Sequence, residues 1–398
     1  MNKPAPLKGI RIITVEQYGA GPFASMFLAD LGAEVIKIEN PASGGDIARK
    51  SGPFFLGDDD SLFFQTFNRN KKSLSLNLKH EAGRKIFHEL VASADAVMNN
   101  LRGDQPAKLG LDYASLQSVN PKIVCAHLSA YGRDNERAGW PGYDYLMQAE
   151  AGFMALTGSP ETPPTRFGLS MVDFMTGATV SGALLAALVG VLKHGEGRDV
   201  DVSLFDVALQ QLTYPATWYL NEGYTTERIG RSAHPSTVPC QLYTSKDGWV
   251  FVMCMTEKFW QLMIEGIGKP ELGEDPRFAT IKDRQSQRAE LQAILDDAFA
   301  AQTTDHWVQL FGGKIPIAPV YELDQALQNN YVAQIGMLQH LPHAQNPDMR
   351  VVASPVKLDG ERPDGKACSP LGADTDDILS SLGYSAEQVS ELKAQDAI

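Results

Sequence analysis

The residues Ile10-Arg-Ile-Ile-Thr-Val-Glu-Gln-Tyr-Gly-Ala-Gly-Pro-Phe-Ala-Ser-Met-Phe-Leu-Ala-Asp-Leu-Gly-Ala-Glu-Val-Ile-Lys-Ile-Glu39 decide the fold. The apolar run over 10–15 predicts a strand, and the helical spacing of apolar residues over 23–31 predicts a helix. Pro22 suits the first turn of that helix, and Gly32 ends it. The residues 34–39 predict a second strand. A strand, a helix and a second strand of these lengths are typical of a parallel α/β sheet.

The same alternation continues along the chain and sets the expected domains. Strands are predicted over 73–78, 96–99 and 121–126, with a helix over 81–92. Later, 241–244 and 249–253 flank an Asp-Gly turn and predict a hairpin, followed by helices over 257–267, 286–300 and 304–311. We expect an α/β large domain over 1–200, a smaller α+β domain over 201–329, and a segment 330–398 that returns to the large domain.

The composition is that of a globular protein and excludes several classes of function. The chain has 398 residues, 43% of them hydrophobic, and a net charge of −13, which argues against a nucleic-acid-binding surface. The N-terminus has no apolar signal core and the four cysteines are far apart, so a reduced cytoplasm is expected. The histidines lack metal-ligand spacing, so we expect no metal. The apolar run 174–192 is interpreted as a buried helix rather than a membrane span, because no second span accompanies it.

Asp173 is the one charged residue between Arg166 and Lys193. A carboxylate in such an apolar run is costly to bury unless something compensates it, and such groups are common at functional sites. Aspartate is also a favoured N-cap, and the residues that follow it predict a helix. The pattern alone leaves both interpretations open, a capping residue or a chemical group.

The segment Gly19-Ala-Gly-Pro-Phe-Ala24 fits the dinucleotide-binding fingerprint G-x-G-x-x-A, and Glu39 ends the next strand where a ribose-binding acid would lie. An NAD-dependent dehydrogenase is therefore an alternative of a different class. No second group suited to hydride transfer is apparent further along. The segment indicates a Rossmann-like β-α-β unit more securely than it indicates a nicotinamide cofactor.

An ordered set of motifs resembles the family III CoA-transferases, which include formyl-CoA transferase and the carnitine CoA-transferase. The resemblance covers nearly the whole chain and is carried by Leu7–Ile12, Ala20–Glu39, Asn68–Lys79, Pro141–Asp144, Gly197–Leu204, Ala233–Ser236 and Pro370–Thr375. It implies a Rossmann-like large domain and a small domain, in a homodimer of two interlocked rings. It also implies small-molecule substrates, an acyl-CoA and a carboxylic acid, with no permanently bound cofactor.

The resemblance also assigns roles to residues. The family's catalytic aspartate matches Asp173, which would be the nucleophile. Tyr143 and Asp144 match active-site positions. The family's CoA-contacting positions match Tyr18, Ala20, Asn40, Leu76, Lys79, Asn100, Leu101, Lys108 and Leu109.

Some expectations concern the substrate. Gly19 replaces a glutamine of formyl-CoA transferase, and the glycine-rich loop of that enzyme has no counterpart over 253–257. These differences argue against formyl-CoA and oxalate as the natural pair. The resemblance to the family, rather than any residue of this chain, suggests succinyl-CoA or another small dicarboxylic acyl-CoA. We also expect small residues such as Gly177 to leave room for the acyl group, and backbone N–H groups after Asp173 to stabilise oxyanions.

Three alternatives stay open. An α-methylacyl-CoA racemase would use a histidine where this chain has Tyr143, and tyrosine is a poor proton shuttle at neutral pH. A dehydrogenase rests only on the glycine turn. A non-catalytic protein would bind CoA without turnover. Three arginines that follow the Tyr143 segment either grip a second carboxylate or form salt bridges: Arg166, Arg228 and Arg231.

Overall fold

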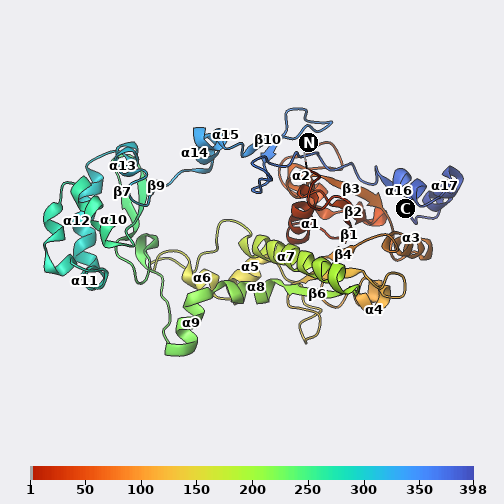
Figure 1. Ribbon diagram of the computed structural model, residues 1–398, viewed down its shortest axis with the longest axis horizontal. Helices are drawn as coiled ribbons and strands as arrows, with labels where there is room; N and C mark the ends of the chain where they lie inside the picture. Colours follow the sequence, from red (N-terminus) through yellow and green to blue (C-terminus); the bar gives the residue numbers. More distant parts are fainter. Residues whose placement is uncertain (1–2) are drawn as a thin grey trace. The chain divides into compact units, whose positions relative to one another are not determined.

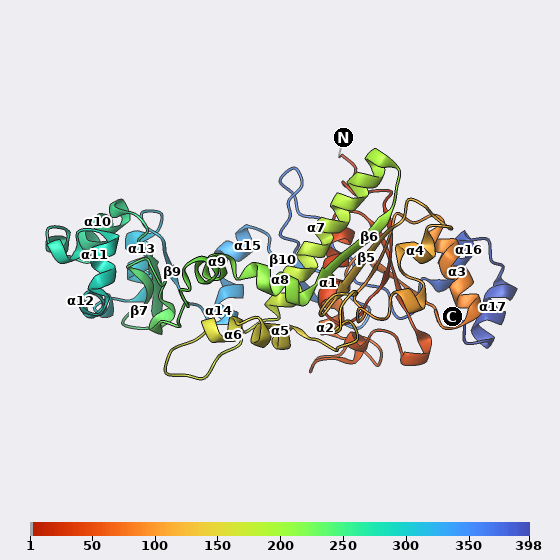
Figure 2. The same cartoon turned by 90° about the horizontal axis from the view of Figure 1, so that it is seen from below.

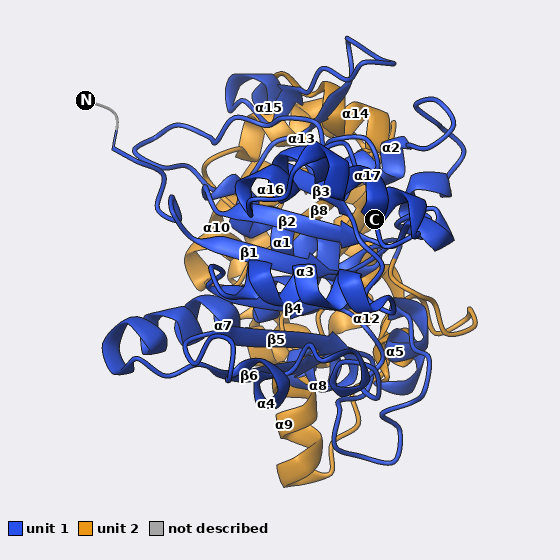
Figure 3. Ribbon diagram, turned by 90° about the vertical axis from the view of Figure 1, so that its right-hand side faces the viewer, with its two compact units in different colours: residues 1–151, 168–212, 331–398 blue, residues 152–167, 213–330 orange. Residues whose placement is uncertain are grey.

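A computed structural model describes residues 3–398 of the chain (Figure 1). The chain divides into two compact units, residues 1–151 with 168–212 and 331–398, and residues 152–167 with 213–330 (Figure 3). The segment 331–398 therefore belongs to the same unit as the first 151 residues. The domain boundaries expected after 200 and after 329 stay predictions.

A six-stranded parallel sheet forms the centre of unit 1, in the order β3-β2-β1-β4-β5-β6 (Figure 3). Its strands are β1 (Arg11–Val15), β2 (Glu34–Glu39), β3 (Lys71–Ser75), β4 (Ala96–Asn99), β5 (Val124–Ser129) and β6 (Arg198–Ser203). The register pairs Ile13 with Ile36 on one side and with Val97 on the other. The sheet confirms the predicted α/β class.

Two predicted strands are displaced from their observed positions. The strand predicted over 73–78 is β3 (Lys71–Ser75), because the chain turns at Asn77, whose carbonyl accepts a hydrogen bond from the N–H of His80. The strand predicted over 121–126 is β5 (Val124–Ser129), because Asn120 accepts from the N–H of Ile123 and so closes a turn before the strand. Apolar runs indicate that a strand exists more reliably than where it begins.

Helices cover both faces of the sheet. On one face α3 (Glu81–Val91), α16 (Thr375–Ser381) and α17 (Ala386–Ala394) bury the core that contains Ile13 and Val97. These helices lie in front of the strands in Figure 3. On the other face α1 (Ala20–Asp30) and α7 (Met171–His194) pack against each other and against the strands (Figure 2).

Shorter elements complete unit 1. They are α2 (Leu62–Asn68), α4 (Tyr113–Leu116), α5 (Asp144–Glu150), α8 (Leu204–Gln211) and the antiparallel pair β10 (Leu338–His340) and β11 (Arg350–Val352). Helix α15 (Asn330–Gln334) covers the sequence boundary between the units.

Unit 2 is built around an antiparallel sheet in the order β7-β8-β9. The strands β7 (Cys240–Thr244) and β8 (Trp249–Met253) form the predicted hairpin, and β9 (Ile317–Pro319) pairs with β8. A core that contains Trp260, Phe299 and Trp307 packs beneath them. The helices of this unit are α6 (Phe153–Leu156), α9 (Thr213–Glu222), α10 (Glu257–Gly266), α11 (Ile281–Ser286), α12 (Arg288–Ala300), α13 (Thr304–Phe311) and α14 (Leu323–Gln328).

Helix α7 is the one helix among residues 3–398 that is long and apolar enough to cross a membrane by length and composition. Its buried side packs closely on α1. A Cβ atom at Gly177 would lie 2.9 Å from the carbonyl oxygen of Ala20 and 2.9 Å from Cδ1 of Phe23. The hydroxyl of Ser181 donates to the carbonyl of Ala24 at 3.1 Å. The expectation that Gly177 leaves room for an acyl group is therefore wrong, since the missing side chain admits α1.

We expect Gly177→Ala to destabilise the protein by about 1–3 kcal/mol, because the added methyl group would contact the backbone of α1 and force the helices apart. Urea unfolding monitored by circular dichroism measures this. Gly182→Ala in the same helix is the control. Gly182 is exposed and nothing lies within 4 Å of its Cβ position, so alanine there should stabilise the protein by about 0.5–1 kcal/mol. Equal effects of both substitutions would contradict the packing argument.

Candidate active site

A cavity of about 640 Å³ lies at the carboxyl ends of the strands of unit 1. The strand order reverses between β1 and β4, and ligands of open α/β sheets bind at such a switch point. The cavity is lined by the segment 17–20 after β1, by Asn100, Leu101 and Arg102 after β4, and by Asp173 of α7. The fold therefore brings the isolated aspartate to the position where this architecture binds ligands.

Asp173 is half-buried and is the third residue of α7. It is not the N-cap, so the capping interpretation of Asp173 is wrong. Its backbone N–H instead donates to Oδ2 of Asp144 at 3.0 Å. A carboxylate from α5 thus satisfies an N–H group in the first turn of α7, which is the function that an N-cap residue usually supplies.

Asp144 is buried at the first position of α5. Its second oxygen, Oδ1, accepts a hydrogen bond from Nε2 of Gln148 at 2.5 Å. Gln148 also donates to the carbonyl of Leu169 at 3.3 Å, just before α7. The Asp144 carboxylate therefore has partners on both oxygens, and it fixes the start of α7 on which Asp173 stands.

The Asp173 carboxyl group has an unusual electrostatic environment. Burial raises the pKa of Asp173 to about 7, and the neighbouring Asp144 carboxylate adds to the effect. No group among residues 3–398 donates a hydrogen bond to the Asp173 carboxylate oxygens. A carboxylate without donors is poorly stabilised, so it is a stronger base and nucleophile than an exposed aspartate.

The glycines of the fingerprint segment serve contacts within the protein. A Cβ atom at Gly19 would lie 3.3 Å from Oδ2 of Asp173, and one at Gly21 would lie 2.8 Å from Cβ of Asn100. Glycine at these two positions lets the first turn of α1 approach both side chains. The pattern that resembles a dinucleotide fingerprint is therefore explained here by the approach of α1 to Asp173 and Asn100.

The structure brings together four of the nine predicted CoA-contacting residues. Tyr18, Ala20, Asn100 and Leu101 line the cavity, as does Tyr143. Asn100 is held in place by two hydrogen bonds to the backbone of Gln17, at 2.9 and 2.7 Å.

The other five predicted CoA-contacting residues do not line the cavity. The side chain of Leu76 is buried in the core beside α3, and Leu109 packs against the same core. Lys79 is exposed, and Asn40 caps the short turn Pro41–Ser43. Lys108 is exposed and forms an ion pair with Asp104 at 2.7 Å. Their predicted roles would therefore need a ligand that extends beyond the cavity.

Several cavity residues had no predicted role. Ile47, Gln105 and Trp140 line the wall, and Arg102 is the arginine among the lining residues. Arg102 forms an ion pair with Asp104 at 3.2 Å. Its position in the sequence could have indicated a place in the site, since Arg102 directly follows Leu101 just after the carboxyl end of β4. A sequence does not show which residues after a strand turn toward a cavity, and this limited the prediction.

The expectation that backbone N–H groups after Asp173 stabilise oxyanions is corrected. The N–H of Asp173 donates to Asp144, and the N–H of Phe174 donates to the carbonyl of Ser170 at 3.2 Å, so these groups are not free to bind an oxyanion.

Two of the three arginines have partners within unit 2. Arg231 forms an ion pair with Asp296, as the salt-bridge alternative expects, and Arg228 donates to the carbonyl of Thr162 at 2.8 Å. In residues 3–398, no three His, Cys, Asp or Glu side chains form a group that could hold a metal ion.

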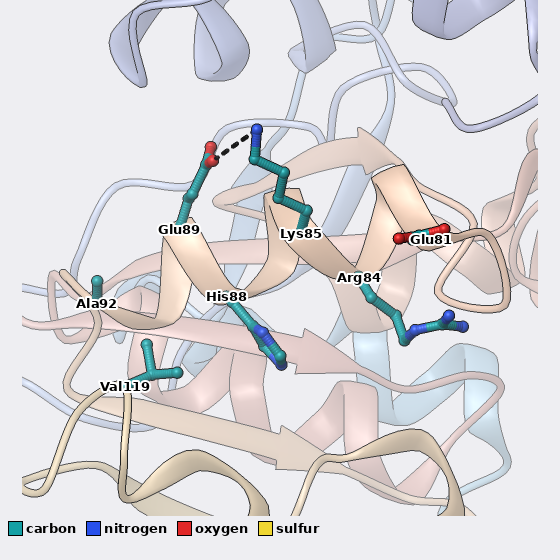
Figure 4. A pocket seen from close by; sticks show the side chains of 7 residues that line it. All are labelled: Glu81, Arg84, Lys85, His88, Glu89, Ala92 and Val119. Atoms are coloured by element: carbon teal, nitrogen blue, oxygen red, sulfur yellow. Dashed lines mark ion pairs between the residues drawn. The ribbon is translucent and has the colours of Figure 1, made fainter.

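A second concave surface of about 630 Å³ lies along α3 (Figure 4). Its lining includes Arg84, His88 and Val119, and the ammonium group of Lys85 lies 3.9 Å from the carboxylate of Glu89. It shares no residue with the cavity of Asp173. Nothing in its composition indicates a nucleophile, because charged groups at this spacing are typical of a solvated helix face.

The fold and the site define an α/β protein with a lone, poorly stabilised carboxylate at the ligand-binding edge of its sheet. Comparison with known families gives the particular family. Residues 7–375 match the model of CoA-transferase family III, and the chain belongs to that family. It is therefore an enzyme of the CoA-transferase class.

Individual relatives match over nearly their whole length. The acetyl-CoA:oxalate CoA-transferase of Acetobacter aceti is 33% identical over 92% of this chain and 94% of its own. The succinyl-CoA:glutarate CoA-transferase of Homo sapiens is 33% identical over 98% of this chain and 90% of its own. A crystal structure of a CAIB/BAIF family protein from Brucella suis superposes with a TM-score of 0.82 at 29% identity, covering 96% of this chain and all of that chain.

We expect Asp173→Asn to stabilise the protein at pH 8 and to stabilise it less at pH 5. The pKa of about 7 lies above the ordinary value of 3.8, so the folded state holds a proton that the unfolded state has released between these values. The stabilising contribution of the protonated form is present below pH 4 and is lost as the pH rises through 7. Asparagine removes the ionised form, for a gain of about 1–2 kcal/mol at pH 8.

Thermal unfolding of wild type and variant at both pH values measures this difference. Asp206→Asn is the matched control, because Asp206 is also the third residue of its helix but is exposed. A gain at pH 8 no larger than that at pH 5 would contradict a raised pKa at Asp173.

Proposed function

We propose that this enzyme transfers CoA from an acyl-CoA to a carboxylic acid, with Asp173 as the nucleophile. One observation carries the proposal. In a chain of this family, a half-buried carboxylate that receives no hydrogen bond from the described part of the chain lies in the cavity at the switch point of the sheet. Its environment raises the basicity of the carboxylate and leaves it accessible to a ligand in the cavity.

The proposed reaction proceeds by acyl exchange at Asp173. The ionised Asp173 oxygen attacks the thioester carbonyl of the acyl-CoA, the C–S bond breaks, and a mixed anhydride and the CoA thiolate result. The thiolate then attacks the aspartyl carbonyl, which releases the first carboxylic acid and leaves an aspartyl-CoA thioester. The acceptor carboxylate attacks this thioester and forms a second anhydride with release of the thiolate. Attack of the thiolate on the acceptor carbonyl yields the new acyl-CoA and regenerates Asp173.

The cavity wall suits these intermediates. Ile47, Leu101, Leu128 and Leu204 give it an apolar lining, which limits hydrolysis of the anhydride by water. The first turn of α1 also lies on the wall, and its N-cap Gly19 provides no side-chain acceptor. The positive end of that helix dipole favours the negative charge that develops at the reacting carbonyl.

Tyr143 and Asp144 receive different roles in this proposal. Tyr143 is 67% exposed and lines the cavity, so it contacts the acyl group or the acceptor. Asp144 does not line the cavity and holds the backbone of Asp173, so it positions the nucleophile. Tyr18, Ala20, Asn100 and Leu101 contact the CoA within the cavity. Residues beyond the cavity would contact its more distant parts: Asn40, Leu76, Lys79, Lys108 and Leu109.

The substrates are proposed from the relatives and from the site. The human relative is named for succinyl-CoA and glutarate, and the Acetobacter aceti relative for acetyl-CoA and oxalate. Arg102 adds a cation to the cavity lining, which favours an acid with a second carboxylate. We propose succinyl-CoA or another small dicarboxylic acyl-CoA as the donor, in a cytoplasmic reaction without a permanently bound cofactor.

A homodimer is proposed from the family resemblance and is supported by α7. The apolar side chains of Val189 and Leu192 are 49% and 81% exposed on this helix, and exposed apolar residues on one helix are typical of a face that a partner covers. Sedimentation velocity of the wild type should give a mass close to 87 kDa, about twice that of one chain. A single species at the mass of one chain across micromolar concentrations would contradict the homodimer.

The covalent mechanism is tested by mass spectrometry. The protein is incubated with a panel of acyl-CoAs that includes succinyl-CoA, glutaryl-CoA and acetyl-CoA, then trapped with hydroxylamine and digested. We expect a hydroxamate on the peptide that contains Asp173 with at least one donor, since both the anhydride and the aspartyl thioester react with hydroxylamine. Asp173→Asn should lose the modification and reduce transferase turnover by at least about a thousandfold.

Asp206→Asn is again the control and should keep both the modification and the turnover. Full transferase activity in Asp173→Asn would overturn the proposal. Exchange of the acyl α-proton with solvent, without any covalent modification, would favour the racemase alternative, although Tyr143 occupies the place of a proton-transferring histidine.

A further inference from the structure

We propose that Lys37 and Asp46 are positioning residues that hold the loop between β1 and α1 against the Asp173 carboxylate. Neither residue lines the cavity, and neither was assigned a role in the sequence. Both side chains are buried, and the ammonium group of Lys37 lies 2.8 Å from Oδ2 of Asp46. Their contacts with the loop backbone carry the inference.

The loop over 16–19 belongs to neither the strand nor the helix, so its backbone groups need partners from elsewhere. Asn100 bonds both the N–H and the carbonyl of Gln17. Nζ of Lys37 donates to the carbonyl of Glu16 at 2.9 Å. Oδ1 of Asp46 accepts from the N–H of Tyr18 at 3.0 Å. Buried side chains thus supply the hydrogen bonds that a strand or a helix would otherwise provide.

These hydrogen bonds hold Tyr18 in an unfavourable backbone conformation. Its φ angle is +71°, in the left-handed region that a tyrosine rarely adopts. A residue held in this conformation is strained and persists only where its surroundings fix it. The hydrogen bond from its N–H to Asp46 is the contact that fixes it on the buried side, while its exposed ring packs on Phe63 with centroids 4.9 Å apart.

The conformation of Tyr18 determines where Gly19 lies. Gly19 is the N-cap of α1, and its Cβ position lies 3.3 Å from Oδ2 of Asp173. A rotation at Tyr18 would therefore displace the chain that borders the carboxylate, and with it the start of α1. Tyr18 and Ala20, at both sides of Gly19, line the cavity.

The Lys37–Asp46 pair is itself anchored in a larger buried network. The N–H of Asp46 donates to Oε2 of Glu39 at 3.0 Å. Glu39 forms two hydrogen bonds with the guanidinium of Arg49, at 2.8 and 2.7 Å. Nζ of Lys71 donates to Oε1 of Glu16 and to the carbonyl of Pro22, at 2.8 and 2.9 Å. Paired charges with several hydrogen bonds each form a rigid support, whereas a single broken pair leaves a costly buried charge.

This inference rests on the proposed function, since the positioned loop matters only if the cavity binds acyl-CoA. Two double variants separate the hydrogen bond to Tyr18 from the ion pair. Lys37→Met with Asp46→Asn removes both charges but keeps an amide oxygen for the N–H of Tyr18. Lys37→Met with Asp46→Ala removes that acceptor as well. Comparing the two isolates the contacts that Oδ1 of Asp46 makes with the N–H groups of Tyr18 and Ala48, at 3.0 and 2.9 Å, and neither leaves a buried charge alone.

The readouts are hydrogen exchange of the peptide that covers 16–24 and the Kd of CoA by calorimetry. We expect the alanine variant to exchange at least about tenfold faster in this peptide and to bind CoA at least about tenfold more weakly than the asparagine variant. Arg11→Met is the control. Arg11 pairs with Glu34 where β1 and β2 begin, and the loop over 16–19 follows the other end of β1. This substitution should change neither readout by more than about twofold.

The outcomes are distinct. Equal exchange in the two double variants would overturn the positioning role of Asp46, whatever the affinity for CoA. Faster exchange with an unchanged Kd would also overturn it, since the loop would then move without consequence for the ligand. A wild-type protein that does not bind CoA would refute the proposed function, while hydrogen exchange would still decide whether Asp46 holds the loop.

Discussion

The close crossing of α1 and α7 is the constraint on which the site depends. Gly177 has no side chain, and the backbone of α1 occupies the space where one would lie. This contact brings the first turn of α7, which carries Asp173, against the first turn of α1, which begins at the carboxyl end of β1. A larger residue at 177 would separate the carboxylate from the loop and from the switch point of the sheet, because packed interiors do not absorb an extra methyl group without movement.

The buried charges of unit 1 divide into two kinds. Glu39 and Arg49 are paired by two hydrogen bonds, and the bonds to Arg49 hold the pKa of Glu39 down at about 2, against the opposing effect of burial. Asp173 is the opposite case, because burial raises its pKa and none of the residues 3–398 donates a compensating hydrogen bond to its carboxylate. The first kind stabilises a structure, while the second kind is costly to it. Proteins retain such a cost mainly where it serves function.

Much of the fold could be predicted because it is encoded locally. The apolar runs within 10–39, with glycine and proline at the turns, predicted β1, α1 and β2. The Asp-Gly turn predicted the hairpin of β7 and β8. The positions of β3 and β5 were displaced, because turns at Asn77 and Asn120 depend on backbone hydrogen bonds rather than on hydrophobicity. The lone charge identified Asp173 as a residue of interest, while its chemical role came from the resemblance to the family.

By itself the sequence determined the fold class, the family and the residue most in need of explanation, because hydrophobic periodicity and ordered motifs are properties of the chain. Only the tertiary structure decided how that residue is surrounded. Asp144 reaches the N–H of Asp173 from another helix, Gly19 approaches the carboxylate from another loop, and Asp46 holds Tyr18 from 28 positions away. Hydrogen bonding, burial and the pKa of a carboxyl group depend on distances in space, and those distances exist only once the chain has folded.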